Sequence, residues 1–65
     1  MKMKPRKLYH AFVSLDDHIE YLNAAGRWTK NSANKKTFKT LRGIKNFAAN
    51  NGEDIMASYG SEEVK

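Results

Sequence analysis

Alternating side chains near the N-terminal end predict two strands. Residues 7–15 are rich in aromatic and β-branched residues, and residues 18–23 alternate Ile19 and Tyr21 with His18, Glu20 and Leu22. Asp16 and Asp17 between them form a turn signal, so the two segments predict a hairpin. Alternation in the first strand predicts two faces: Leu8, His10, Phe12 and Ser14 on one, and Tyr9, Ala11, Val13 and Leu15 on the other.

The next segment predicts short strands separated by polar turns. Residues 23–26 form a turn in which Gly26 can take a positive φ, and residues 27–29 form a third extended segment. Residues 30–35 are polar and without periodicity, which predicts an exposed loop. Residues 36–38 are a candidate for one more short edge strand.

Helical periodicity begins after residue 40. Thr40 suits the N-cap, Leu41, Ile44 and Ala48 recur on one face, and Gly52 follows as a stop signal. Gly43 costs about 1 kcal/mol relative to Ala inside a helix, or marks a close approach of the helix to the sheet. The pattern predicts a helix over residues 41–50.

These elements predict an α+β fold with a three- to four-stranded antiparallel sheet and one helix packed on a face. Residues 55–59 fit a last strand or a short helical turn. The predicted organisation is a flexible basic arm (1–6), one small domain (7–59) and a polar acidic tail (60–65). The predicted core consists of Trp28, Phe38, Phe47 and Phe12 packed against Leu41 and Ile44.

The distribution of charge along the sequence suggests a candidate function. The stretch from residue 21 to residue 52 holds no Asp or Glu but seven cations: Arg27, Lys30, Lys35, Lys36, Lys39, Arg42 and Lys45. Such a field attracts polyanions, so these residues are predicted to contact a nucleic-acid backbone, with duplex DNA as the expected form. Lys39 and Arg42 stand at the positive end of the predicted helix dipole, where cations are unfavourable. An anionic partner would explain that placement; an ordinary solvated face is the alternative.

Two tyrosines suggest a different partner. Tyr9 and Tyr21 are predicted to be neighbours on the outer face of the hairpin, where aromatic side chains often dominate protein interfaces. The rival hypothesis is therefore an effector that binds an acidic patch of a host protein.

Motifs of catalysis and metal binding are missing from the sequence. It has no cysteine, no glycine-rich phosphate loop, no nucleophile elbow and no zinc-ligand spacing. His10 and His18 stand near Asp16, Asp17 and Glu20, which allows a metal or acid–base site, but surface or half-buried histidines are the simpler interpretation. We expect no catalytic residues, cofactor, metal or small-molecule substrate. No apolar run predicts a membrane span, and a cytoplasmic location is expected.

Two resemblances add to this reading. Residues 21–29, 36–40 and 41–50 resemble a pattern in small phage and mobile-element proteins: Tyr-Leu, Gly-x-Trp-Thr, then Phe-x-Thr opening a helix. This resemblance implies a sheet-plus-helix fold and a phage-encoded protein. A weaker similarity is to the arm-type DNA-binding domains of tyrosine integrases, whose sheet enters the major groove. It implies that Arg27, Lys30 and Lys36 contact DNA from the sheet side.

Overall fold

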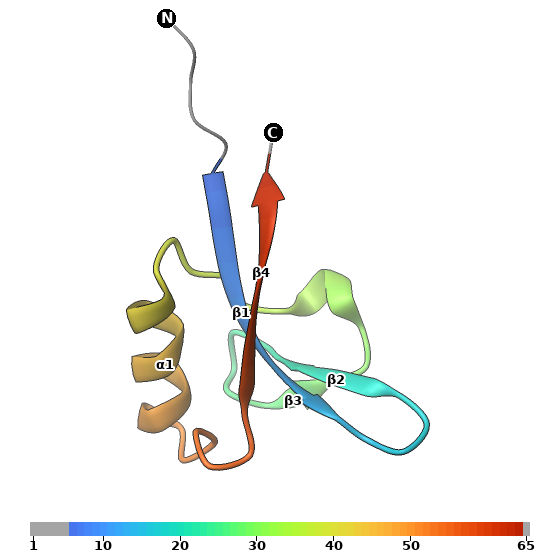
Figure 1. Cartoon of the computed structure of the whole chain (residues 1–65). Helices are drawn as coiled ribbons and strands as arrows, with labels where there is room; N and C mark the ends of the chain where they lie inside the picture. The colour runs from blue at the N-terminus through green and yellow to red at the C-terminus, as the bar shows by residue number, and fades with distance from the viewer. Residues whose placement is uncertain (1–5, 65) are drawn as a thin grey trace, which may run out of the picture.

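The computed structural model describes residues 6–64, which form a four-stranded antiparallel sheet with one helix on a face (Figure 1). In chain order the elements are β1 (Arg6–Ser14), β2 (Ile19–Leu22), β3 (Trp28–Thr29), the 3₁₀ helix η1 (Ser32–Asn34), α1 (Leu41–Asn50) and β4 (Ser58–Val64). The strand order is β3-β2-β1-β4. The predicted α+β class, with four strands and one helix, is confirmed.

β1 is the strand on which the sheet is built, because it pairs with both β2 and β4. Phe12 lies opposite Tyr21 of β2, and His10 lies opposite Gly60 of β4. The predicted alternation holds: Ala11 is fully buried beneath α1, while its neighbours His10 and Phe12 point to the other face. Gly60 leaves room for these two rings, since a Cβ there would stand 3.0 Å from His10 Nε2.

The last strand differs from the prediction. Residues 54–56 form a turn, and β4 begins only at Ser58 and continues to Val64, so residues 60–64 are a strand and not a tail. Its seven residues pair with β1 from Phe12↔Ser58 to Arg6↔Val64. Arg6, predicted to belong to the arm, therefore begins β1; residues 1–5 and 65 of the predicted arm and tail lie outside the described residues. β4 pairs with residues of β1 that lie 46 to 58 positions earlier in the chain, which no local pattern reveals.

The predicted edge strand at residues 36–38 is also absent. Instead, this segment makes single bridges to two strands. Phe38 exchanges both backbone hydrogen bonds with Tyr9 of β1, at 2.8 and 2.9 Å, and the Lys36 N–H donates to the Leu22 carbonyl of β2 at 2.8 Å. The segment therefore fills the place where β1 and β2 separate. The preceding loop is exposed, as predicted, and contains η1.

The ends of α1 are those that the sequence predicts. The Thr40 hydroxyl accepts a hydrogen bond from the Gly43 N–H at 3.0 Å, and Gly52 follows the helix with a φ of +72°. A Cβ at Gly43 would stand 3.0 Å from the Phe38 ring. Gly43 thus allows the first turn of the helix to approach the bridging segment closely.

The core is small and lies between α1 and the sheet. Among residues 6–64, four are fully buried: Ala11, Leu22, Ile44 and Ala48. Trp28, Phe38 and Phe47 pack against them, as predicted. Phe12 does not, because its position in β1 directs it to the opposite face, where its ring lies 5.8 Å from that of His10. Leu41 is also not enclosed, since 39% of it is exposed at the first helical turn.

Candidate anion-binding site

A cleft of about 380 Å³ opens beside the start of β1 and is lined by Arg6, Lys7, Leu8, Lys39 and Val64. Two features of the fold assemble it. The bridge between Phe38 and Tyr9 brings Lys39 alongside β1, and the register of β4 places Val64 opposite Arg6. Its volume is near the lower end of the range of about 300–1,000 Å³ that small ligands occupy, so the cleft can hold a group the size of a phosphate or nucleotide.

The backbone of β1 is also available in this cleft. The N–H and C=O of Tyr9 face Phe38, and those of Lys7, two residues earlier, face the same edge. Within residues 6–64, nothing pairs with β1 on that side before Tyr9. The cleft therefore offers a backbone N–H donor beside its cationic side chains.

The cleft carries an excess of positive charge. Arg6, Lys7 and Lys39 are all exposed, and in the described part of the chain none of them makes an ion pair. Glu63 lies opposite Lys7 in the strand register without an ion pair between them. Three cations line one solvent-open space, which favours an anionic ligand because such a ligand would reduce their mutual repulsion.

The structure brings only one of the seven predicted cations into this cleft, Lys39. The Lys35 ammonium is instead bound to the Glu62 carboxylate at 3.2 Å, and it lies 5.8 Å from the centre of the Tyr21 ring. The Lys36 and Lys45 ammonium groups lie 5.3 and 5.7 Å from the centres of aromatic rings, those of Phe38 and Tyr59 respectively. These three cations already have interactions within the chain.

The remaining predicted cations, Arg27, Lys30 and Arg42, are exposed and do not line the cleft. Two of the three cations of the cleft are not among the predicted binding residues, because the sequence pattern places Arg6 in the basic arm and Lys7 in a strand. The available signal was the basic run through residues 2–7 that leads directly into the first strand. What joins it to Lys39 is the bridge at Phe38, a contact between distant segments.

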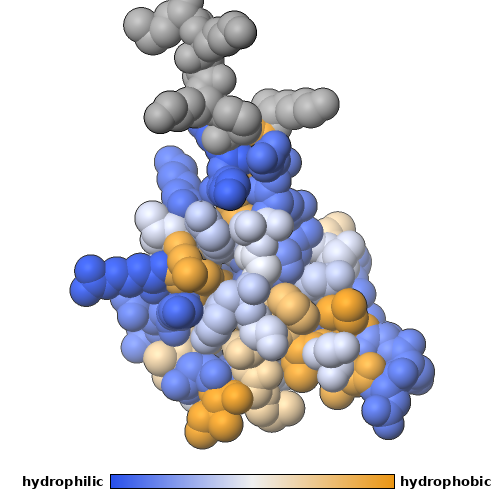
Figure 2. All heavy atoms as spheres, viewed as in Figure 1, coloured by the Kyte–Doolittle hydropathy of each residue, from blue (hydrophilic) through white to orange (hydrophobic). Residues whose placement is uncertain are grey.

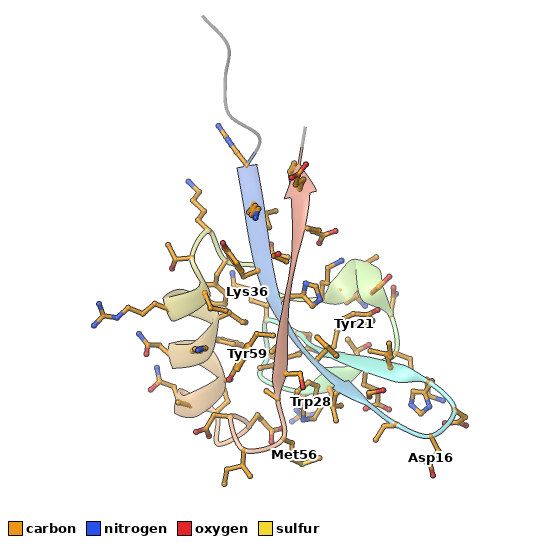
Figure 3. The ribbon with its side chains drawn as sticks, in the orientation of Figure 1. Asp16, Tyr21, Trp28, Lys36, Met56 and Tyr59 are labelled. Carbon is orange, nitrogen blue, oxygen red and sulfur yellow. The ribbon has the colours of Figure 1, made fainter. Side chains whose placement is uncertain are left out.

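Tyr9 and Tyr21 do not form the common outer surface that the sequence predicts. Tyr21 lies opposite Phe12, so it shares the face of the even-numbered residues of β1. Tyr9 is odd-numbered and packs on the core beneath α1. Figure 3 shows the difference between the two faces: Tyr59, which shares the face of Tyr9, points toward α1, and Tyr21 points the other way.

On the face away from α1, His10 sits among aromatic rings. Its ring centre lies 5.8 Å from that of Phe12 and 5.7 Å from that of Tyr21. Burial by these neighbours lowers the His10 pKa below 6.5, and the nearby Lys35 lowers it further, while Glu62 acts in the opposite direction. The side chain is therefore neutral at physiological pH.

The second histidine has the opposite environment. At the end of the hairpin, His18 Nδ1 lies 2.6 Å from Asp17 and Nε2 lies 2.8 Å from Glu20. Both nitrogens donate when the ring is protonated, so the hydrogen bonds to Glu20 and then Asp17 raise the His18 pKa above 6.5. Within residues 6–64, no group of three or more His, Asp or Glu side chains is arranged to hold a metal ion.

We expect the two histidines to titrate on opposite sides of pH 6.5, with His18 above and His10 below. Because folding raises the His18 pKa, the protonated ring stabilises the folded state. This contribution is complete below the unfolded-state pKa of about 6.5 and is lost as the pH rises through the higher folded-state pKa. An NMR titration of the imidazole signals measures both values. The variant Glu20→Gln should lower the His18 pKa and leave that of His10 unchanged; a His18 pKa at or below that of His10 would contradict the assignment.

Comparisons with known proteins do not identify the chain. No protein-family model matches it, and neither the curated proteins nor the solved structures searched contain a match. Among the described residues, no helix has the length and apolar character needed to cross a membrane.

Proposed function

We propose that this chain is a small, non-enzymatic, phage-encoded protein that binds the phosphate backbone of nucleic acid. The nucleic acid that it binds is duplex DNA, in the host cytoplasm. The observation that carries the proposal is that Arg6, Lys7 and Lys39 all line one open cleft and form no ion pair in the described chain. Phosphates bind such clusters of cations and release counterions as they do so.

Other features support a backbone contact. The N–H of Lys7 on the open edge of β1 is a suitable donor to a phosphate oxygen, as main-chain N–H groups commonly are. Arg42 is exposed in the first turn of α1, two residues after the Thr40 N-cap, and adds a further positive charge near the start of the helix. None of these contacts reads a base, so we expect binding with little sequence preference.

A titration of fluorescent duplex DNA at several salt concentrations tests the proposal. Three phosphate contacts predict that the logarithm of the binding constant falls with the logarithm of salt concentration at a slope of about −3. No binding at low salt, or a slope near zero, would contradict the proposed function.

A second candidate partner is an acidic protein. It is favoured by the same open edge of β1, where an extended acidic peptide could add backbone pairing at Lys7 to contacts with Leu8 and Val64. Affinity capture from nuclease-treated host lysate distinguishes the two. A stoichiometric protein that survives nuclease supports this candidate, and retention of nucleic acid that disappears with nuclease supports the first.

A further inference from the structure

β4 forms an edge of the sheet that the described chain leaves uncovered. It is the last strand in the order β3-β2-β1-β4, and five of its seven residues are exposed: Ser58, Ser61, Glu62, Glu63 and Val64. In Figure 1, β4 lies in front of β1, with α1 to one side. In the same view, Figure 2 shows atoms of intermediate hydropathy along the central region of the molecule. Folded proteins usually protect so long an edge, because its unpaired backbone groups bind other strands.

The sheet register shows which backbone groups face outward. Tyr9 exchanges its hydrogen bonds with Phe38, on the side of β1 away from β4, so the even-numbered residues of β1 face β4. Their partners in β4 are also even-numbered, as in His10↔Gly60. The outward N–H and C=O groups therefore belong to the odd-numbered residues: Tyr59, Ser61 and Glu63.

We propose that a second copy of this chain occupies this edge, with the two β4 strands paired antiparallel about a two-fold axis at Ser61. Ser61 is the central residue of β4, so this register pairs all seven residues and uses every outward-facing backbone group. A register centred on Glu62 would place two carboxylates opposite each other, which is unfavourable. One centred on Gly60 would leave Glu63 and Val64 without partners.

Charge complementarity selects a second copy as the occupant. In the Ser61-centred register, Glu63 stands opposite Tyr59 of the other chain, on the face that α1 covers. The Lys45 ammonium lies 5.7 Å from the centre of that Tyr59 ring. Each Glu63 would thus meet Lys45 of the other copy, giving two symmetric ion pairs.

The same residues have no such contact within one chain. Glu63 lies four residues from Tyr59 along β4, a distance of about 13 Å in a strand, and no ion pair joins it to Lys45 among the described residues. Glu62 points to the other face, where Lys35 of its own chain already offsets its charge at 3.2 Å. The acids of β4 therefore do not oppose self-pairing in this register.

Pairing would join two sheets into one continuous eight-stranded sheet with both helices on the same face. Lys39 and the open edge of Lys7 lie on the side of β1 away from β4, so this proposal does not depend on the proposed function. It requires only the edge of β4 and the charges beside it.

Sedimentation equilibrium of the purified chain without nucleic acid, from micromolar to millimolar concentrations, tests the pairing. The wild type should fit a monomer–dimer equilibrium. Glu63→Lys and Lys45→Glu should each raise the dimer Kd about tenfold, because two ion pairs become like-charge contacts. The double variant Lys45→Glu/Glu63→Lys should restore the wild-type Kd.

The control is Asp16→Lys, which makes the same charge change as Glu63→Lys at the exposed tip of the hairpin, away from β4 (Figure 3). It should leave the Kd unchanged. Circular dichroism of each variant verifies that it is folded. A wild type that remains monomeric at millimolar concentration, assemblies larger than a dimer, or a double variant as weak as the single ones would each overturn the proposal.

Discussion

Replacing Ile44 by Ala is expected to remove most of the stability of this protein. Ile44 lies in α1, is fully buried, and is one of four enclosed core residues in the described part of the chain. Truncating such a side chain costs about 2–5 kcal/mol, from lost apolar burial and from the cavity left behind. A domain of this size without cross-links has a total stability of roughly 3–5 kcal/mol. Much of the variant should therefore be unfolded at 25 °C.

The chain provides a matched control for this experiment. Ile55 lies in the turn before β4 and is 92% exposed, so Ile55→Ala removes the same atoms with an expected change within about 0.5 kcal/mol. Urea unfolding followed by circular dichroism measures both variants. Equal losses of stability from the two substitutions would show that the core between α1 and the sheet is not where folding free energy is concentrated.

The parts of the fold that the sequence predicted are those with local signals. The hairpin of β1 and β2 follows from alternation around Asp16 and Asp17, and α1 follows from periodicity between Thr40 and Gly52. Each of these signals lies within the element that it predicts or next to it, so the element can be predicted without knowledge of tertiary contacts.

The parts that were missed depend on pairing between distant residues. β4 is rich in Ser, Gly and Glu, so its sequence alone predicts a polar tail. It is a strand because β1 provides its backbone hydrogen-bond partners. Likewise, Phe38 belongs to an isolated bridge with Tyr9 because the chain turns into α1 immediately afterwards. Neither pairing has a signature within a short window of sequence, because in each case the partner residues in β1 lie far away along the chain.

The candidate site, too, has residues that the sequence predicts and residues that only the fold brings together. Composition predicts a cationic surface that includes Lys39, but only the fold places Arg6 and Lys7 in the same cleft as this residue. The prediction for Tyr9 and Tyr21 failed for a related reason. A shift of one residue between paired strands moves a side chain to the other face, and the pairing Phe12↔Tyr21 puts the two tyrosines on opposite sides.

The cleft can be separated from the general positive field by two variants of equal charge. Lys7→Glu/Lys39→Glu reverses two cations that line the cleft, whereas Arg27→Glu/Lys30→Glu reverses two exposed cations outside it. Each pair changes the net charge by the same amount. If phosphates bind in the cleft, the first variant should lose about a hundredfold in affinity for duplex DNA, because two charge-assisted contacts are replaced by repulsion.

The salt dependence makes this comparison decisive. Losing two phosphate contacts should reduce the slope of log affinity against log salt by about 2, so the first variant should respond only weakly to salt. The Arg27→Glu/Lys30→Glu variant should keep the wild-type slope. Near physiological salt it should also bind DNA within about threefold of the wild-type affinity, because screening weakens interactions between charges that are more than about 8 Å apart. All four side chains are exposed, so both variants should remain folded, but Lys7→Glu places a carboxylate opposite Glu63 and should slightly lower the unfolding temperature of the first variant. Equal losses of affinity and slope in both would assign binding to the overall field of the molecule, and Lys7 and Lys39 would then have no special part in it.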